Sequence, residues 1–307
     1  MVRLFTLGGL ALERDGQLLD GIANRKVLLA LLALVAAERG IGRDKLVAYL
    51  WPDSDESRGR NNLKQSLFGL RRELGAPVVV SSGGTLRLDP AAVSCDLADF
   101  EAAVAAGDLA TAAELYRGPF LDGFYLAERS ELEHWMEGER YRLHRMYSEV
   151  LRGLGNEAET EGDSAGAVRW WRLAAATEPY SAPVALGAMR ALVAAGDRAG
   201  ALEHARLYQS ALRDEMGLPP EPSVSQFAES LRAASPHGPR LTGGQEEATP
   251  LSPSLLLPAL ADGPIAVPAA PRRLRFGWLT LVIPVLAALA VAVAVQVFRG
   301  SRSVPAV

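Results

Sequence analysis

The residues with the clearest potential for chemistry lie between Arg58 and Arg72, a segment with five basic side chains and no acidic one. On a helix with about 100° between residues, its leucines fall within about 60° of one another and form a face that can pack on a core. These leucines are Leu63, Leu67, Leu70 and Leu74. The opposite and adjoining positions carry arginine, asparagine, glutamine and an aromatic ring, which read base edges in the major groove of DNA. The predicted base-reading residues are Arg58, Asn61, Asn62, Gln65, Phe68 and Arg72.

Further basic residues flank this face, where the sugar–phosphate backbone of bound DNA would pass. The predicted phosphate contacts are Arg60, Lys64 and Arg71 in the same segment, and Arg87 in a following hairpin, where it could also reach the minor groove. An alternative interpretation is an ordinary solvated amphipathic helix that binds nothing. The exposed face has no acidic residue in a chain with 36 acidic and 32 basic residues, and this favours DNA binding.

The distribution of charge supports the same assignment. Residues 1–95 hold 13 Lys/Arg and 10 Asp/Glu, a net charge of +3, whereas residues 96–235 hold 13 Arg and 23 Asp/Glu, a net charge of −10. Only the N-terminal part is therefore expected to meet a polyanion. Because +3 is a small charge, we expect a monomer to bind DNA weakly and two or more copies on one site to compensate.

The elements around this segment predict a winged helix-turn-helix domain. Alternating apolar and polar residues at the start of the chain, interrupted by Gly8-Gly9 and Asp15-Gly16, predict a small antiparallel sheet over residues 2–19. Three helices are expected next, over residues 24–39, 43–51 and from Ser54 or Asp55 to 74. A hairpin over residues 78–88, with a glycine turn, then provides the wing.

The chain from residue 96 to about 235 shows helical patterns and no strand pattern. Gly107-Asp108, Gly162-Asp163 and Gly196-Asp197 each precede an alanine-containing segment, and the last two pairs are 34 residues apart. This period is that of tetratricopeptide (TPR) repeats, in which glycine ends one helix, aspartate caps the next and alanines allow close packing. A long helix is also expected over residues 128–156.

The strongest single signal lies near the end of the sequence, where residues 276–298 contain no charged side chain. As a helix these 23 residues would be roughly 34 Å long, enough to cross a hydrocarbon core of about 30 Å. Arg272, Arg273 and Arg275 precede the segment, and Arg299 and Arg302 follow it. No secretory signal opens the sequence, and the apolar residues 27–37 are interpreted as a buried helix. We therefore expect a single-pass protein of the cytoplasmic (inner) membrane with its N-terminal domains in the cytoplasm.

The predicted fold class is mainly α, with a small sheet and wing in the first domain. The predicted order is a winged-helix DNA-binding domain (1–95), a TPR-like α-helical domain (96–235), a Pro/Ala/Gly-rich linker (236–275), a transmembrane helix (276–298) and a short tail (299–307).

Enzymatic chemistry finds little support in the sequence. No nucleophile elbow, zinc-protease helix or nucleotide-binding loop is present, so no catalytic residues and no cofactor are predicted. The four histidines are scattered and have no cysteine partners at ligand spacing, so no metal site is predicted. The single cysteine, Cys95, is expected to be a small residue at a domain junction rather than a redox sensor.

The sequence resembles the SARP family of bacterial transcriptional activators over residues 2–231. In the first part, the resemblance is carried by Leu4-Phe5 with Leu7-Gly8-Gly9, Arg25-Lys26 and residues 46–52, 61–67 and 70–75. In the second part, it is carried by residues 96–100, 115–121, 178–180 and 212–218, and by Trp135 with Glu139-Arg140.

The resemblance implies an OmpR-like winged helix followed by a bacterial transcriptional activator domain. It further implies that the third helix binds promoter DNA, that the helical domain supports homodimer formation or contacts RNA polymerase, and that the regulator is an activator. The predicted membrane helix departs from this pattern and suggests a tethered regulator. The alternative left open by the sequence is a membrane-anchored TPR adaptor that binds proteins and not DNA.

Overall fold

The structure, a computed structural model, describes residues 1–19 and 25–233. It opens with an antiparallel meander of β1 (Val2–Phe5), β2 (Ala11–Arg14) and β3 (Gln17–Leu18), as the alternating pattern predicts. The β2–β3 turn holds Asp15 and Gly16 at positive φ, a geometry suited to a two-residue hairpin. A fourth strand, β7 (Val93–Cys95), was not predicted and pairs with β1 in parallel, giving the order β3-β2-β1-β7.

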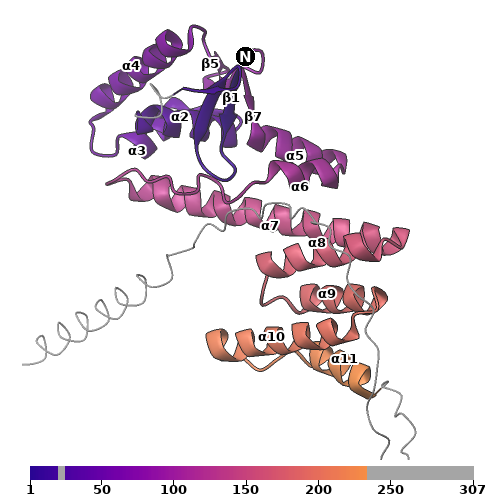
Figure 1. Cartoon of the computed structure of the whole chain (residues 1–307). Helices are drawn as coiled ribbons and strands as arrows, with labels where there is room; N and C mark the ends of the chain where they lie inside the picture. Colours follow the sequence, from indigo (N-terminus) through magenta and orange to yellow (C-terminus); the bar gives the residue numbers. More distant parts are fainter. Residues whose placement is uncertain (20–24, 234–307) are drawn as a thin grey trace, which may run out of the picture. The chain divides into compact units, whose positions relative to one another are not determined.

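Three helices and a hairpin follow the meander in the predicted order. They are α2 (Lys26–Ala37), α3 (Arg43–Leu50), α4 (Glu56–Leu74) and the hairpin β5 (Val79–Ser82) and β6 (Thr85–Leu88). A two-residue strand, β4 (Ile41–Gly42), also escaped prediction and pairs with β6, so that the wing belongs to a three-stranded sheet. The elements stand in the order that the prediction of a winged helix requires (Figure 1), and we refer to residues 1–95 by that predicted name.

Helix α2 confirms that the apolar run near the N-terminus is a core helix. Every residue from Leu28 to Val35 is buried, because the helix lies among α3, α5 and β6. A helix that is apolar on all sides must be enclosed to be stable in water.

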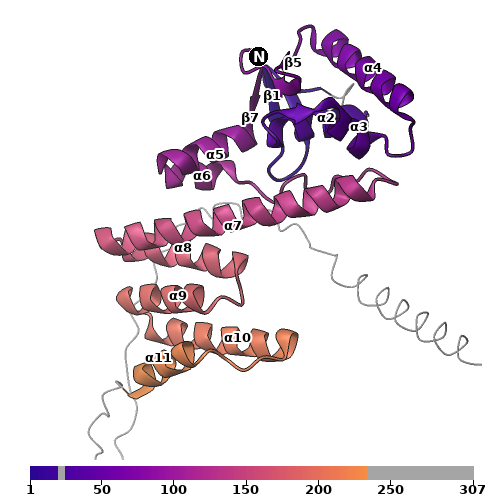
Figure 2. The ribbon, with the colours of Figure 1, turned by 180° about the vertical axis from the view of Figure 1, so that it is seen from behind.

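The chain from residue 96 onward is helical in the part that the structure describes. Its helices are α5 (Asp96–Ala106), α6 (Leu109–Leu115), α7 (Ser130–Glu161), α8 (Ser164–Thr177), α9 (Ala182–Ala194), α10 (Arg198–Met216) and α11 (Pro222–Ala233). Helix α7 is one continuous helix of 32 residues, five residues longer at its end than the predicted 128–156. Figures 1 and 2 show α7 between the winged helix and the stack of α8 to α11.

The Gly-Asp repeat acts as predicted. The side chains of Asp108, Asp163 and Asp197 each accept a hydrogen bond from the backbone N–H three residues later, at 3.1, 2.9 and 2.7 Å. Each aspartate thereby caps α6, α8 or α10, and the caps set the start of each second helix in the repeat.

One apolar core runs from the meander through α2 and α3 to α5, α6 and the first part of α7. Smaller cores lie between α7, α8 and α9 and between α9, α10 and α11. The predicted linker, transmembrane helix and tail, residues 236–307, lie outside the described residues. Among the residues that are described, no helix is both long and apolar enough to span a membrane.

Candidate nucleic-acid interface

Helix α4, which carries the predicted DNA-reading face, has well-defined ends. The Asp55 carboxylate accepts a hydrogen bond from the Arg58 backbone N–H at 2.9 Å, which lowers the pKa of Asp55. Gly75 ends the helix at φ 65°, in the left-handed region that glycine adopts without steric cost. Arg71 and Arg72 lie in the last turn, where the helix dipole favours positive charge.

The buried side of α4 packs against α3 as the leucine pattern predicts. Leu63, Leu70 and Leu74 are buried, whereas Leu67 is only half-buried. The two helices lie close together at Gly59, because a Cβ atom at this position would lie 2.4 Å from Cγ1 of Val47. The residue type at position 59 therefore sets how closely α4 can lie on α3.

The predicted base-reading residues lie on the outer side of α4. Arg58, Asn61, Gln65, Phe68 and Arg72 are exposed, and Asn62 is half-buried. Phe68 is 67% exposed, an unusual position for a ring that could otherwise be buried. The structure thus brings all six to one accessible surface, and their role as base contacts stays a prediction.

The predicted phosphate contacts differ in their surroundings. Lys64 and Arg71 are exposed and have no ion pair among the described residues. Arg60 is paired with Asp44 at 3.2 Å and Glu56 at 2.7 Å, so it would have to exchange these partners to bind a phosphate. Arg87 is exposed on β6, and its guanidinium lies close to Gly40.

A cleft of about 690 Å³ lies beside the DNA-reading face, between α4 and the first turn of α2. Asn62, Gln65 and Gly69 of α4 face Arg25 and Lys26 across it. Neither basic residue of α2 was predicted as a site residue, because the sequence does not show that this turn lies beside α4. Arg25 is held there by an ion pair with Glu73 at 2.7 Å.

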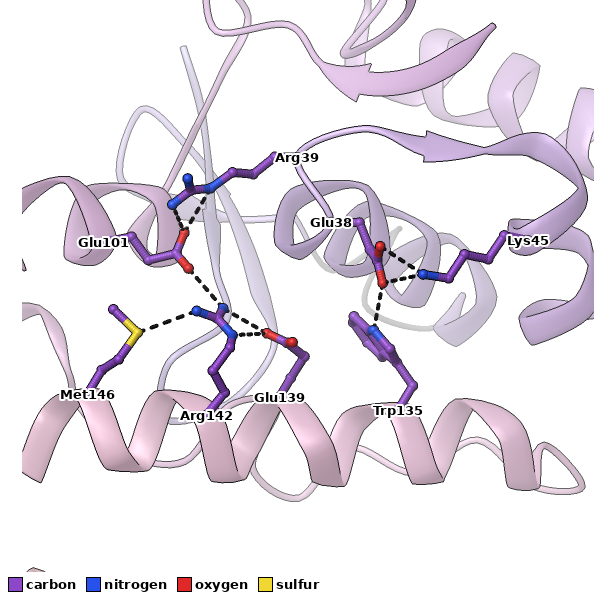
Figure 3. Close-up of polar contacts among 8 residues, drawn as sticks. All are labelled: Glu38, Arg39, Lys45, Glu101, Trp135, Glu139, Arg142 and Met146. Atoms are coloured by element: carbon purple, nitrogen blue, oxygen red, sulfur yellow. Dashed lines mark hydrogen bonds and ion pairs between the residues drawn. The ribbon is translucent and has the colours of Figure 1, made fainter. Parts of the chain in front are cut away.

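The winged helix and the helical domain meet at a polar junction, which we define as Glu38, Arg39, Lys45, Glu101, Trp135, Glu139 and Arg142 (Figure 3). The Trp135 indole N–H of α7 donates to Glu38 at 2.9 Å, and Lys45 of α3 donates to the same carboxylate at 2.8 Å. The hydrogen bond to Glu38 raises the pKa of Lys45. The carboxylate of Glu101 on α5 contacts both Arg39 and Arg142.

Backbone groups also join the two parts. The buried Asp96 carboxylate, at the start of α5, accepts hydrogen bonds from the Thr6 and Leu7 N–H groups at 2.8 to 3.0 Å. The Arg129 guanidinium donates to the Leu50 carbonyl at the end of α3, at 2.8 Å. Helix α4 therefore belongs to a part of the chain that is itself joined to α5 and α7.

A second concave surface lies in the helical domain, between α8 and α10. This groove of about 320 Å³ is lined by several alanines and by Arg172, Glu178, His204 and Leu207. Leu207 is 52% exposed. Burial and the charge of Arg172 lower the pKa of His204.

Other reactive groups are isolated. Cys95 is buried, and burial together with the nearby Asp96 raises its pKa to about 12, so that the thiol stays protonated near neutral pH. Within residues 1–19 and 25–233, no three His, Cys, Asp or Glu side chains are grouped as metal ligands.

Comparison with known proteins agrees with this architecture. Residues 89–232 match the family described as "Bacterial transcriptional activator domain", which confirms the predicted nature of the helical domain. That family is a class of transcription regulator domain and not a class of enzyme. No curated protein matched the sequence.

A solved structure of Mycobacterium tuberculosis EmbR, in complex with a low-affinity phosphopeptide, has a similar fold. The similarity has a TM-score of 0.55 with 20% sequence identity, and it covers 77% of this chain. The chain spans 66% of the EmbR structure, slightly less than two thirds of its length. This match supports the mainly helical fold with small sheets.

Proposed function

We propose that the protein is a sequence-specific DNA-binding transcriptional regulator that inserts α4 into the major groove of promoter DNA. One observation carries the proposal: the exposed face of a well-capped helix holds Arg, Asn, Gln and Phe and no acidic residue. The major groove is about 12 Å wide and admits a helix whose side chains reach the base edges. The match of residues 89–232 to an activator domain supports regulation of transcription as the purpose of binding.

The surroundings of α4 support a role for phosphate contacts. Lys64 and Arg71 flank the base-reading side chains, and Arg87 extends from the wing. We propose that these residues hold the DNA backbone, and that the helical domain pairs two copies of the chain or contacts RNA polymerase. A net charge of +3 per winged helix is too small for tight binding by one copy. Two copies on one site would double the number of phosphate contacts and so strengthen the binding.

We further propose that the regulator is tethered to the cytoplasmic membrane through residues 276–298. The support is the uncharged sequence of this segment and the arginines on both sides of it. Deletion of residues 276–298 should move the protein from the membrane to the soluble fraction of a cell lysate. If the shortened protein stays with the membrane, this segment is not the anchor.

The DNA-binding proposal can be tested with residues 1–240, which form one compact unit. This fragment would be mixed with a genomic DNA-fragment library at low and high salt, and the retained DNA would be sequenced. Selective enrichment that decreases at high salt would support the proposal and identify the operator. A folded fragment that retains no DNA at low salt would contradict it.

Single substitutions would then test the face itself. Asn61→Ala or Arg72→Ala should weaken binding to the enriched site by about 1–3 kcal/mol if these side chains contact bases. Arg145→Ala is a matched control, because Arg145 is exposed on α7 and paired only with Glu149 of the same helix. Unchanged affinity for both α4 variants would exclude this face as the reader.

The groove between α8 and α10 favours a second candidate function, a membrane-anchored adaptor that binds a protein partner without DNA. An exposed leucine beside a concave surface is suited to an apolar side chain of a partner. This candidate predicts that Leu207→Ser abolishes capture of the partner by the full chain while the α4 substitutions have no effect.

A further inference from the structure

The polar junction contains one carboxylate shared by two guanidinium groups from different parts of the fold. Glu101 of α5 is only 7% exposed as a side chain. Its Oε1 lies 2.8 Å from Nη2 of Arg142, and its Oε2 accepts a hydrogen bond from Nε of Arg39 at 3.1 Å. Figure 3 shows Arg39 reaching Glu101 from one side and Arg142 from the other. Glu101 is therefore the common partner of the winged helix and of α7.

The position of Arg39 makes this contact relevant to α4. Arg39 lies two residues after the end of α2 and precedes β4 and α3, so it belongs to the turn that leads into the helix-turn-helix pair. Its backbone has φ 51°, a left-handed conformation that non-glycine residues rarely adopt. The ion pair between Arg39 and Glu101 therefore connects this turn to α5 on the other side of the junction.

We propose that Glu101 is a positioning residue of the junction: it fixes the direction of the winged helix, and thus of α4, relative to the helical domain. This inference rests on the proposed function. Without the negative charge, Arg142 would keep Glu139 as its partner, but Arg39 would lose this counter-charge and would face the guanidinium group of Arg142. Their mutual repulsion in a partly buried site would move the turn before α3 away from α5 and α7.

A fixed direction matters because the two parts have different tasks in the proposed function. When α4 lies in the major groove, the rigid junction determines where around the DNA axis the helical domain projects. A partner that contacts the helical domain, or a second copy of the chain, then meets it at one defined place. With Glu101 neutral, α4 would still bind DNA, and the apolar core and the hydrogen bonds of Asp96 and Arg129 would still join the two parts. The contact that fixes the direction of the winged helix would be lost, so that the helical domain would sample several directions.

The experiment measures the distance between the two parts in the full chain, in detergent micelles. Spin labels would be placed on Asp53→Cys, before α4, and Glu157→Cys, on α7; both positions are exposed. Cys95 can stay, because its buried, protonated thiol does not compete for the label. The parent protein should give one narrow distance distribution, and Glu101→Gln should give a broad one. Glu101→Asp, which keeps the charge, should restore a narrow distribution.

Glu139→Gln is the matched control. Glu139 pairs with the same Arg142 at 2.8 Å, but both residues belong to α7, so this ion pair does not cross the junction. Its removal should leave the distribution narrow. If Glu101→Gln does not fold, Arg39→Gln replaces it, since the Arg39 side chain is 66% exposed and its loss removes the contact of Glu101 with the winged helix. A narrow distribution in the folded variant that lacks the Glu101–Arg39 pair would overturn the proposal.

A second readout connects the junction to DNA. Energy transfer between a dye at position 157 and a dye on one end of the operator reports the direction of the helical domain. Glu101→Gln should bind the operator with the affinity of the parent protein. It should show a spread of transfer efficiencies where the parent protein shows one value. If the variant shows the same single value as the parent protein, the proposal is overturned. If the parent protein binds no DNA, the proposed function fails, whereas the distance measurement without DNA still decides whether Glu101 positions the winged helix.

Discussion

The close approach of α3 and α4 at Gly59 leads to a prediction that tests the packing of α4. Gly59→Ala adds one methyl group whose carbon would lie 2.4 Å from Cγ1 of Val47, whereas carbon atoms in contact normally lie about 3.5–4.0 Å apart. The helices must therefore separate by roughly 1 Å, or Val47 must leave its rotamer. We expect Gly59→Ala to destabilise the fold.

The magnitude follows from two opposing effects. Overpacking of this kind lowers the free energy of unfolding by about 1–3 kcal/mol. Replacing a glycine within a helix by alanine raises it by about 0.5–1 kcal/mol. The net loss should be at most about 2.5 kcal/mol, with a middle value of about 1 kcal/mol. Gly69 provides the comparison, because it lies on the same helix and a Cβ there would meet no atom within 4 Å. Gly69→Ala should therefore stabilise the protein by about 0.5–1 kcal/mol.

Thermal unfolding of residues 1–240 separates these outcomes, because 1 kcal/mol shifts the Tm of a domain this size by about 2–4 °C. Gly59→Ala should lower the Tm and Gly69→Ala should raise it. Val47→Ala removes the clashing methyl group, so the double variant should be more stable than the sum of the two single changes implies. The reasoning is refuted if Gly59→Ala is as stable as Gly69→Ala.

Three further predictions concern buried groups. Asp96→Asn should reduce the free energy of unfolding by about 2–4 kcal/mol, because the carboxylate accepts hydrogen bonds from Thr6 and Leu7 in a buried site; an unchanged denaturation midpoint would contradict this. Cys95, with its pKa raised to about 12, should not react with a thiol reagent at pH 8 until the protein unfolds, and rapid modification of the native protein would show that it is accessible. His204 has a lowered pKa, so the unfolded chain binds its proton more readily, and stability should fall as pH drops through the ordinary histidine value of 6.5. His204→Gln should lose that part of the pH dependence in unfolding curves measured from pH 7 to pH 5.

The local features of the winged helix and of the repeats could be predicted from the sequence. Asp55 and Gly75 have the residue types that begin and end helices, and the structure places them at the two ends of α4. The Gly-Asp pairs likewise predicted the caps of α6, α8 and α10. In each case the cause lies within about four residues of its effect, so the sequence contains all the information that is needed.

Features that depend on distant partners could not be predicted. β7 has only three residues and is a strand because it pairs with β1, some 90 positions earlier. Glu101 looks like an ordinary exposed acid on a helix, and nothing in the sequence near it shows that Arg39 and Arg142 converge on it. The cleft beside α4 was missed for the same reason, since Arg25 and Lys26 meet Gln65 only after the chain folds.

The parallel pairing of β1 with β7 has a consequence for synthesis of the protein on the ribosome. β1 lies between β2 and β7 in the sheet, but Val2 finds its partner Val93 only after about 90 more residues have been made. At about 5–20 residues per second, one edge of β1 waits unpaired for roughly 5–20 s. During that time the nascent chain exposes the backbone groups of an apolar strand, which is a template for wrong pairing. Because β1 has only four residues, few backbone groups are exposed in this way. The exposure ends when β7 and α5 have been synthesised and β7 pairs with β1.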